Sequence, residues 1–268
     1  MLKQRLISAI LMLIIFVGCF FFLPNPFFEV VVLTITAILF FELRGLLVLS
    51  SGQSVIYWLI SLSCLLPALI FRDDLLSFST FFVLLACFFW VVLAPLNMMK
   101  GTNSPPQRNL FHCLYGLVVI APMTYSVLIL YSQNKSFLLF VFITIWMADI
   151  GAYFTGKRFG SIKIAASISP GKSMEGALGG IFFNVLLVLL VKLNFAEFYL
   201  VNGLIFCITI SALSIYGDLY ESLLKRLAGV KDSSNLIPGH GGFLDRVDGF
   251  LPALPAALIF HEYLSLTV

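Results

Sequence analysis

Acidic side chains stand at helical spacings in the C-terminal half of the chain. Asp245 and Asp248 are three residues apart, and Asp218 precedes Lys225 by two helical turns. On helices, these spacings place the side chains on a shared face. Carboxylate oxygens that face a cavity bind hard divalent cations such as Mg²⁺. We therefore predict that Asp218, Asp245 and Asp248 form a metal site.

Asp149 is a further acidic candidate, because it lies inside an apolar run that begins at Phe142. A carboxylate within a membrane span costs a few kcal/mol unless it faces a cavity, a cation or a partner. Tyr153 follows four residues later on the same helix face. We expect Asp149 to be a fourth metal ligand or a substrate ligand, with Tyr153 beside it. A polar pair that packs two helices is the alternative.

Basic side chains accompany these acids: Lys172, Lys225, Arg226, Lys231 and Arg246. Lys172 stands between Gly171 and Ser173 just before an expected helix, where a lysine can contact phosphate. The alternative there is a charge at the membrane surface, with Ser173 as a helix cap. Carboxylates for Mg²⁺ beside cations for phosphate are typical of phosphoryl and nucleotidyl transfer.

A glycine-rich loop leads from Pro238 through His240, Gly241 and Gly242 to the last apolar segment. Glycines let the backbone approach a ligand closely, and free amides at a helix start suit phosphate oxygens. We therefore assign Gly241 and Gly242 to nucleotide binding. His240 is a candidate ligand of phosphate or metal, with a structural role as the alternative.

The composition decides what kind of protein must position these residues. Of 268 residues, 60% are hydrophobic, 28 are Phe, and only 11% are charged, against about 25% in a soluble domain. This composition excludes a soluble globular enzyme, a disordered chain, a secreted disulfide scaffold and a nucleic-acid binder. It predicts an all-α polytopic bundle of transmembrane helices.

Apolar stretches of about 20 residues give nine candidate spans. They cover residues 6–23, 28–49, 55–71, 75–96, 110–131, 137–156, 175–192, 199–216 and 243–263. We expect N-terminal transmembrane helices over 1–109 and a C-terminal transmembrane catalytic region over 110–268. The polar stretches 157–174 and 217–242 are the expected cytoplasmic loops of that region.

Lys and Arg predict the orientation. With a cytoplasmic N-terminus and nine alternating spans, only Arg72, Lys135 and Lys192 of the 16 basic residues lie on the far side. This agrees with the positive-inside rule and places the acidic and basic cluster at the cytoplasmic face. We expect a bacterial inner membrane as the host.

At this cluster the sequence resembles the phosphatidate cytidylyltransferases, also called CDP-diacylglycerol synthases. The positions that match their signature are Ser222, Leu224, Lys225, Arg226, Lys231, Asp232, Ser234, Ile237, Pro238, His240, Gly241, Gly242, Phe243, Asp245, Arg246, Val247 and Asp248. Asp149 to Tyr153 and Ser169 to Gly176 also resemble family motifs. Ile150, Gly171 and Ser173 depart mildly from them. Outside residues 149–248, only the apolar character and Glu42 resemble the family.

The resemblance implies that CTP and phosphatidic acid react to give CDP-diacylglycerol and pyrophosphate. It also implies Mg²⁺, a second cation such as K⁺, and a homodimer within membrane lipid. Asp218, Asp245, Asp248, Lys225 and Arg226 would then be catalytic. The expected ligand-binding residues are Tyr153, Lys172, Ser173, Lys231, His240, Gly241, Gly242 and Arg246, with Asp149 as a further metal ligand.

Three other functions fit parts of the pattern. Asp149 and Asp218 at two spans resemble an intramembrane aspartyl protease, which would need no Mg²⁺. A carboxylate beside a broken helix could belong to a cation transporter, which would carry ions without nucleotide. A related lipid kinase or lipid nucleotidyltransferase would differ only in its nucleotide and lipid. The protease leaves Asp245, Asp248 and the basic loops unexplained. The transporter predicts a site deep in the bilayer, whereas the acidic cluster lies at the mouths of the expected spans.

Overall fold

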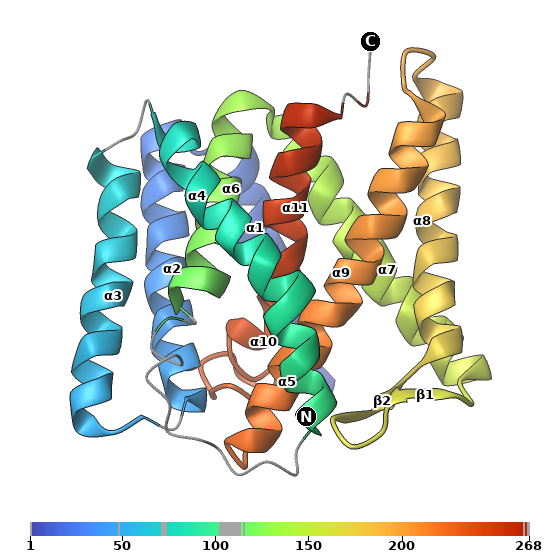
Figure 1. Cartoon of the computed structure of the whole chain (residues 1–268). Coiled ribbons are helices and arrows are strands. Elements are labelled where there is room, and N and C mark those ends of the chain that lie inside the picture. Colours follow the sequence, from blue (N-terminus) through green and yellow to red (C-terminus); the bar gives the residue numbers. More distant parts are fainter. Residues whose placement is uncertain are drawn as a thin grey trace.

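The computed structural model describes residues 2–47, 49–70, 74–101, 114, 116–264 and 266. Within these ranges the chain is a bundle of helices with one small β-hairpin at the end that carries the N-terminus (Figure 1). The boundary expected between residues 109 and 110 lies outside the described residues, as does Arg72.

The first four helical segments run back and forth across the bundle. They are α1 (Leu2–Phe22), α2 (Asn25–Leu46), α3 (Ser51–Ile70) and α4 (Leu75–Phe88), which continues through the π-helical η1 (Phe89–Leu93) into α5 (Ala94–Lys100). Pro24 separates α1 from α2 in an extended conformation, and Pro26 lies in the first turn of α2. A first-turn proline is tolerated because no helical acceptor awaits its missing N–H group.

The remaining helices carry the predicted chemistry. They are η4 (Gly116–Ile120), α6 (Ala121–Gln133), α7 (Lys135–Phe159), α8 (Met174–Asn194), α9 (Leu200–Leu227), α10 (Leu244–Val247) and α11 (Phe250–Tyr263). Strands β1 (Lys163–Ala165) and β2 (Ser169–Ser173) pair antiparallel between α7 and α8. Ser173 begins α8 as its cap, because its hydroxyl accepts the Gly176 amide.

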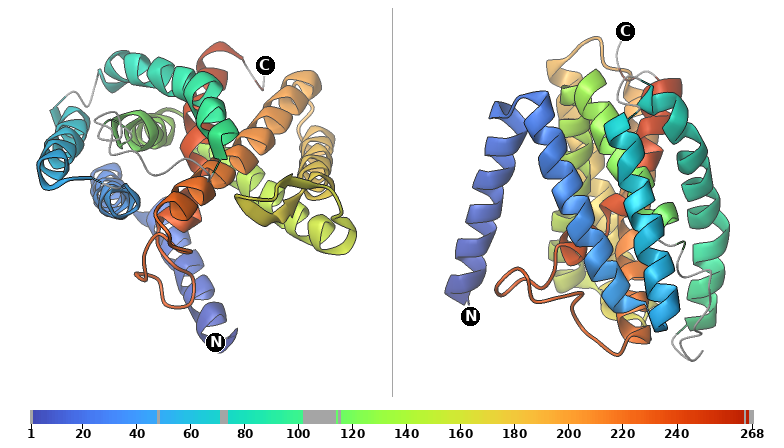
Figure 2. Two further views of the ribbon diagram at one scale, coloured as in Figure 1. Left: turned by 60° about the horizontal axis from the view of Figure 1, so that its bottom comes forward. Right: turned by 90° about the vertical axis from the view of Figure 1, so that its left-hand side faces the viewer.

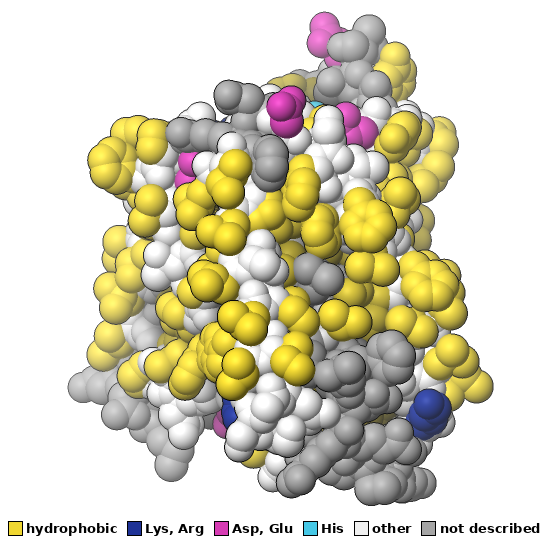
Figure 3. Space-filling model, turned by 60° about the vertical axis from the view of Figure 1, so that its left-hand side comes forward, with side chains coloured by type: hydrophobic (Ala, Val, Ile, Leu, Met, Phe, Trp, Pro, Cys, Tyr) yellow, Lys and Arg dark blue, Asp and Glu magenta, His cyan; other side chains and the backbone are white. Residues whose placement is uncertain are grey.

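The fold is that of an all-α polytopic membrane protein. Among the described residues, six helices are long and apolar enough to span a membrane. Apolar side chains also cover much of the outer face shown in Figure 3. Nine spans and a cytoplasmic N-terminus stay predictions, because α1, α6 and α11 have shorter apolar stretches.

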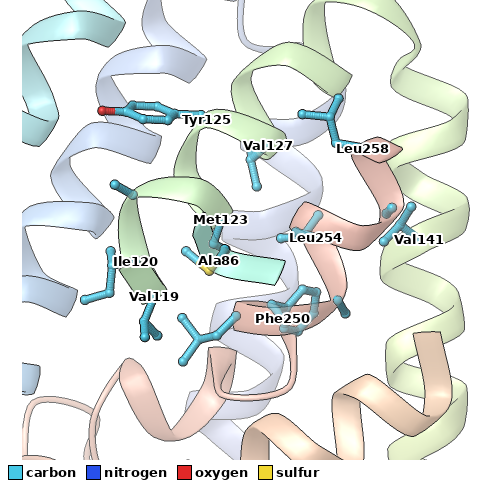
Figure 4. Packing of buried hydrophobic residues seen from close by; sticks show 14 of the residues in the cluster. Ala86, Val119, Ile120, Met123, Tyr125, Val127, Val141, Phe250, Leu254 and Leu258 are labelled. Atoms are coloured by element: carbon cyan, nitrogen blue, oxygen red, sulfur yellow. The ribbon is translucent and has the colours of Figure 1, made fainter. Parts of the chain in front are cut away.

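Two of the shorter apolar helices, α6 and α11, form the interior of the bundle. Every residue of α6 from Ala121 to Tyr131 is buried, and α11 packs against α6 and α9. Figure 4 shows the apolar side chains that meet there, among them Val119, Ile120, Met123, Val127, Phe250, Leu254 and Leu258. A helix that is apolar on all sides is expected where other helices surround it.

The structure corrects two expected helix boundaries. The stretch 217–242, expected as a loop, begins as helix: α9 continues the span expected over 199–216 through Leu227 and carries Asp218 and Lys225. The span expected over 243–263 is broken into α10 and α11. At the break, Gly217 lies so close to the carbonyl of Asp248 that no side chain fits between them.

Glycines set the contact between α7 and α8, and Gly176 and Gly180 stand at the four-residue spacing typical of such contacts. A Cβ atom on Gly180 would lie 2.6 Å from the Ala148 carbonyl oxygen, and one on Gly176 would lie 3.0 Å from that of Ala152. The two backbones therefore touch, which is the packing that small residues at this spacing allow. This contact sets the distance between Asp149 on α7 and the start of α8.

Candidate active site

One cavity of about 970 Å³ contains most of the candidate side chains. Its polar part, here called the polar chamber, lies where α7, the hairpin, α9 and α10 converge. The charged and polar residues that line the chamber are Asp149, Tyr153, Lys172, Ser173, Asp218, Lys225, Asp232, Asp245, Arg246 and Asp248. All of these except Asp232 were assigned to the site from the sequence.

Lys172 joins the hairpin to α9. Its ammonium group forms an ion pair with Asp218 and donates a hydrogen bond to the Ile215 carbonyl at 3.3 Å. Strand β2 delivers Lys172 to this place because the next residue, Ser173, begins α8. The pair brings together a predicted phosphate ligand and a predicted metal ligand.

Lys225 is held between two carboxylates. Its Nζ atom lies 2.6 Å from Oδ1 of Asp245 and pairs with Glu221, one helical turn earlier on α9. Glu221 is only 1% exposed. A buried carboxylate needs a paired charge, and Lys225 is the cation that provides it.

Asp245 accepts hydrogen bonds from the loop that precedes it. Its Oδ2 atom lies 2.7 Å from the Gly242 amide, 2.9 Å from the Ser233 amide and 2.8 Å from the Ser233 hydroxyl. Burial disfavours the charged form of this carboxyl. The Lys225 ammonium and the two amides favour it more strongly, so the pKa of Asp245 lies below its ordinary value. Asp245 is therefore ionised at neutral pH.

Asp149 and Asp248 lie within electrostatic range of the same charges. Both interact with Asp218 and Lys172, and Asp248 accepts the Gly249 amide at 2.9 Å. Among the described residues, no three side chains of His, Cys, Asp or Glu stand close enough to hold a metal by themselves. Lysines, rather than other carboxylates, are the direct partners of Asp218 and Asp245.

Five of the predicted site residues lie outside the cavity lining. Arg226 is exposed and donates from Nε to the Ile168 carbonyl at 3.3 Å, which ties α9 to the hairpin. Lys231 is exposed on the loop after α9. The other three, His240, Gly241 and Gly242, form the turn that leads into α10.

That turn is held by contacts on both sides. Nδ1 of His240 lies 2.7 Å from the Ser8 hydroxyl of α1, and its carbonyl accepts from Arg246 at 2.8 Å. Gly241 has φ +86°, a conformation that side-chain-bearing residues rarely adopt. The backbone conformation therefore requires glycine at position 241, whether or not a nucleotide binds there.

Comparison with known proteins agrees with this arrangement. A model of the cytidylyltransferase family matches residues 3–264. The chain belongs to this family. It is 34% identical to the phosphatidate cytidylyltransferase of Haemophilus influenzae, over 98% of this chain and 99% of that one. It is also 34% identical to the phosphatidate cytidylyltransferase of Pseudomonas aeruginosa, over 97% of each chain.

The part of the cavity away from these charges is apolar, and no sequence motif indicated it. This apolar arm runs between α1, α2, α6 and α7 and is lined by Met12, Leu13, Phe16, Cys19, Phe28, Val31, Val32, Ile35, Met123, Val127, Phe142 and Trp146. Figure 2 shows α1 standing away from the other helices on this side. In a family of cytidylyltransferases, an apolar extension of a charged site suits a substrate with hydrocarbon chains.

Sequence reasoning also missed polar residues that support the site. Glu221 shares a helix face with Asp218 and Lys225, so its spacing was a usable signal. Ser233 gave no signal, because a serine in a loop is common. Glu42 was noted in the sequence only as part of the family resemblance. In the structure it is 1% exposed and contacts the loop before α10.

Proposed function

We propose that this chain transfers the cytidylyl group of CTP to phosphatidate, giving CDP-diacylglycerol and pyrophosphate. The single observation that carries the proposal is the cavity itself, in which a charged chamber continues into an apolar arm. A nucleotide and a phosphate headgroup suit the chamber, and acyl chains suit the arm. Membership of the cytidylyltransferase family and two near-full-length relatives with this name support the same reaction.

In the proposed reaction, a phosphate oxygen of the lipid attacks the α-phosphorus of CTP, and the bond to the pyrophosphate leaving group breaks. The attacking oxygen is already ionised at neutral pH, so the site needs no strong general base. The main barrier is repulsion between two anions. Lys172, Lys225 and Arg246 offset this repulsion and orient the phosphates, which is how fixed cations accelerate phosphoryl transfer.

The chemistry of the chamber suits Mg²⁺. Its ligating groups are all carboxylate oxygens, and Mg²⁺ usually needs only one or two carboxylates, with substrate phosphates and waters completing its shell. Asp218 and Asp245 are the residues we assign to it first, followed by Asp248 and Asp149. When bound, Mg²⁺ supplies positive charge to the phosphates. We assign a second cation such as K⁺ to the same acidic chamber.

The polar chamber has more acids than bases, which suits the binding of added cations. Its acids are Asp149, Asp218, Asp232, Asp245 and Asp248, with Glu221 beside Lys225, and its bases are Lys172, Lys225 and Arg246. The lysines offset the acids directly in this structure, and the same lysines would contact phosphate once cations bind to the acids.

We further propose that the protein works as a homodimer in the bacterial inner membrane, with its site facing the cytoplasm. The six membrane-compatible helices and the bacterial relatives support the membrane location. The distribution of Lys and Arg supports nine spans with a cytoplasmic N-terminus. Arg226, Lys231 and His240 remain our candidates for contacts with CTP as it enters from the cytoplasm.

The deciding experiment uses detergent-solubilised protein with CTP labelled in its α-phosphate, phosphatidic acid and Mg²⁺. We expect the label to enter a lipid product only when lipid and metal are both present. Exposed Glu197, on the α8–α9 turn, provides a control as Glu197→Gln. If the folded protein transfers no label, this reaction is wrong. Other nucleotides and lipids would then be tested as substrates.

A further inference from the structure

Glu42 connects the N-terminal helices to the loop that carries Asp245. It lies near the end of α2, and its carboxylate accepts hydrogen bonds from two backbone amides, Phe243 at 3.0 Å and Leu244 at 2.6 Å. It also accepts the hydroxyls of Ser234 at 2.6 Å and Ser233 at 3.4 Å. About 200 residues of sequence separate the two sides of this contact.

Backbone and hydroxyl groups, rather than a cation, offset this buried charge. Among the described residues, no Lys or Arg forms an ion pair with Glu42. A buried carboxylate is costly unless hydrogen bonds satisfy it, and four donors do so here. Phe243, which precedes α10, offers no capping side chain of its own. Glu42 therefore supplies the cap that the local sequence lacks.

The contact between Glu42 and the loop leaves no room for a side chain at Gly242. A Cβ atom at Gly242 would lie 2.6 Å from Oε1 of Glu42. The φ of Gly242 is not positive, so its glycine is needed for space rather than for backbone conformation. The glycine that the sequence assigned to the nucleotide thus makes room for a side chain of α2.

Ser233 links Glu42 to the active site. Its hydroxyl lies 2.8 Å from Oδ2 of Asp245 and 3.4 Å from Oε2 of Glu42, so two carboxylates share one donor. We propose that Glu42 is a positioning residue, which holds the segment from Ser233 to Leu244 so that Asp245 faces Lys225 and the polar chamber. The inference rests on the proposed function and adds a residue that does not touch substrate.

The helix that carries Glu42, α2, also lines the apolar arm. Phe28, Val31 and Ile35 of the same helix line the apolar arm. One helix therefore contacts the proposed place of the acyl chains at one end and fixes Asp245 at the other.

The test compares Glu42→Gln with Ser234→Ala and with Glu197→Gln as the control. A glutamine keeps the size of Glu42 but turns an amide N–H₂ toward donors that need an acceptor. We expect kcat to fall about 10- to 100-fold, as for residues that orient a ligating side chain, and KM for CTP to change less than about threefold. Ser234→Ala should give a smaller fall in the same direction.

Hydrogen exchange provides a readout that needs no metal and no turnover. In the substrate-free, metal-free protein, amides of residues 242–245 should exchange faster in Glu42→Gln than in wild type, while α6 keeps its protection. Wild-type kcat and unchanged exchange at 242–245 would overturn the proposal. If Glu42→Gln does not fold, Ser234→Ala decides, and wild-type behaviour there overturns it. An inactive wild-type protein would instead count against the proposed function.

Discussion

The polar chamber and the apolar arm belong to one cavity, but they are built by different physics. The chamber depends on short, directional contacts such as those of Lys225 with Asp245 and of Lys172 with Asp218. The arm depends on aromatic packing, in which Phe16 meets Trp146 at 5.0 Å and Phe142 at 5.5 Å between ring centroids. Charged hydrogen bonds depend strongly on geometry, whereas apolar packing tolerates changes that keep volume.

This difference predicts where single substitutions act. A change of one atom in the chamber should affect the reaction itself. A change in the arm should alter only KM for the lipid, in proportion to the side-chain volume added or removed. The following experiments separate the two parts, from the largest expected effect to the smallest.

Asp245→Asn should lower turnover at least about 100-fold, the scale at which loss of one electrostatic group reduces catalysis. The amide N–H₂ would face either Lys225 or the Gly242 and Ser233 amides, all of which are donors. Label transfer from CTP to lipid measures the effect. Normal turnover with Asn at this position would remove Asp245 from the site.

Lys172→Met should raise KM for CTP or for phosphatidate about tenfold, because a hydrogen bond to a charged group contributes about 1.5–3 kcal/mol. The variant removes the partner of Asp218 but leaves β2 and the Ser173 cap intact. Steady-state kinetics with each substrate varied in turn would show which phosphate Lys172 contacts. Lys192→Met, at the other end of α8, is the matched control. Equal kinetics in both variants would contradict the assignment.

Val31→Phe should raise KM for long-chain phosphatidate about fivefold to tenfold, since added volume in a filled apolar site costs at least about 1 kcal/mol. Val31 lines the apolar arm, whereas its neighbour Val30 is 60% exposed. Val30→Phe is therefore the control. KM for CTP should stay constant in both. A CTP effect equal to the lipid effect would show that the two parts of the cavity are not separable.

Ser8→Ala should have the smallest effect, a change in turnover below about fivefold, because one neutral hydrogen bond contributes about 1 kcal/mol. The hydroxyl of Ser8 contacts Nδ1 of His240 at 2.7 Å and the Pro238 carbonyl at 3.2 Å. Turnover at saturating substrate is the measurement. A loss as large as that of Asp245→Asn would move His240 into the reaction itself.

Local patterns in the sequence were enough to predict several features. A glycine is typical of a helix end, and Gly229 has φ +72° one residue beyond the cap of α9. The four-residue spacing of Gly176 and Gly180 is typical of closely packed helices, and α7 and α8 pack in this way. These features depend on neighbours within a few residues, so a single sequence contains the information.

Features that depend on distant segments could not be predicted. Nothing near Glu42 indicates that its carboxylate accepts hydrogen bonds from amides about 200 residues later. The break between α10 and α11 lies against Gly217 of another helix, whereas apolar content alone suggested one continuous span. Arg226 and Lys231 carry the same charge as Lys225, but of the three only Lys225 lines the cavity. The position of each residue on α9 or on the loop after it decides this.

The backbone contact between α7 and α8 has a mechanical consequence. Gly151, Gly176 and Gly180 bring the backbones of the two helices into contact, so the helices cannot tilt apart without opening a gap. They behave as one stiff wall that carries Asp149 and Ser173 at a constant separation. The opposite side of the cavity is bounded by α1, which has few neighbours. The charged side of the cavity is therefore the stiffer one, and the side bounded by α1 is the one with fewer contacts to other helices.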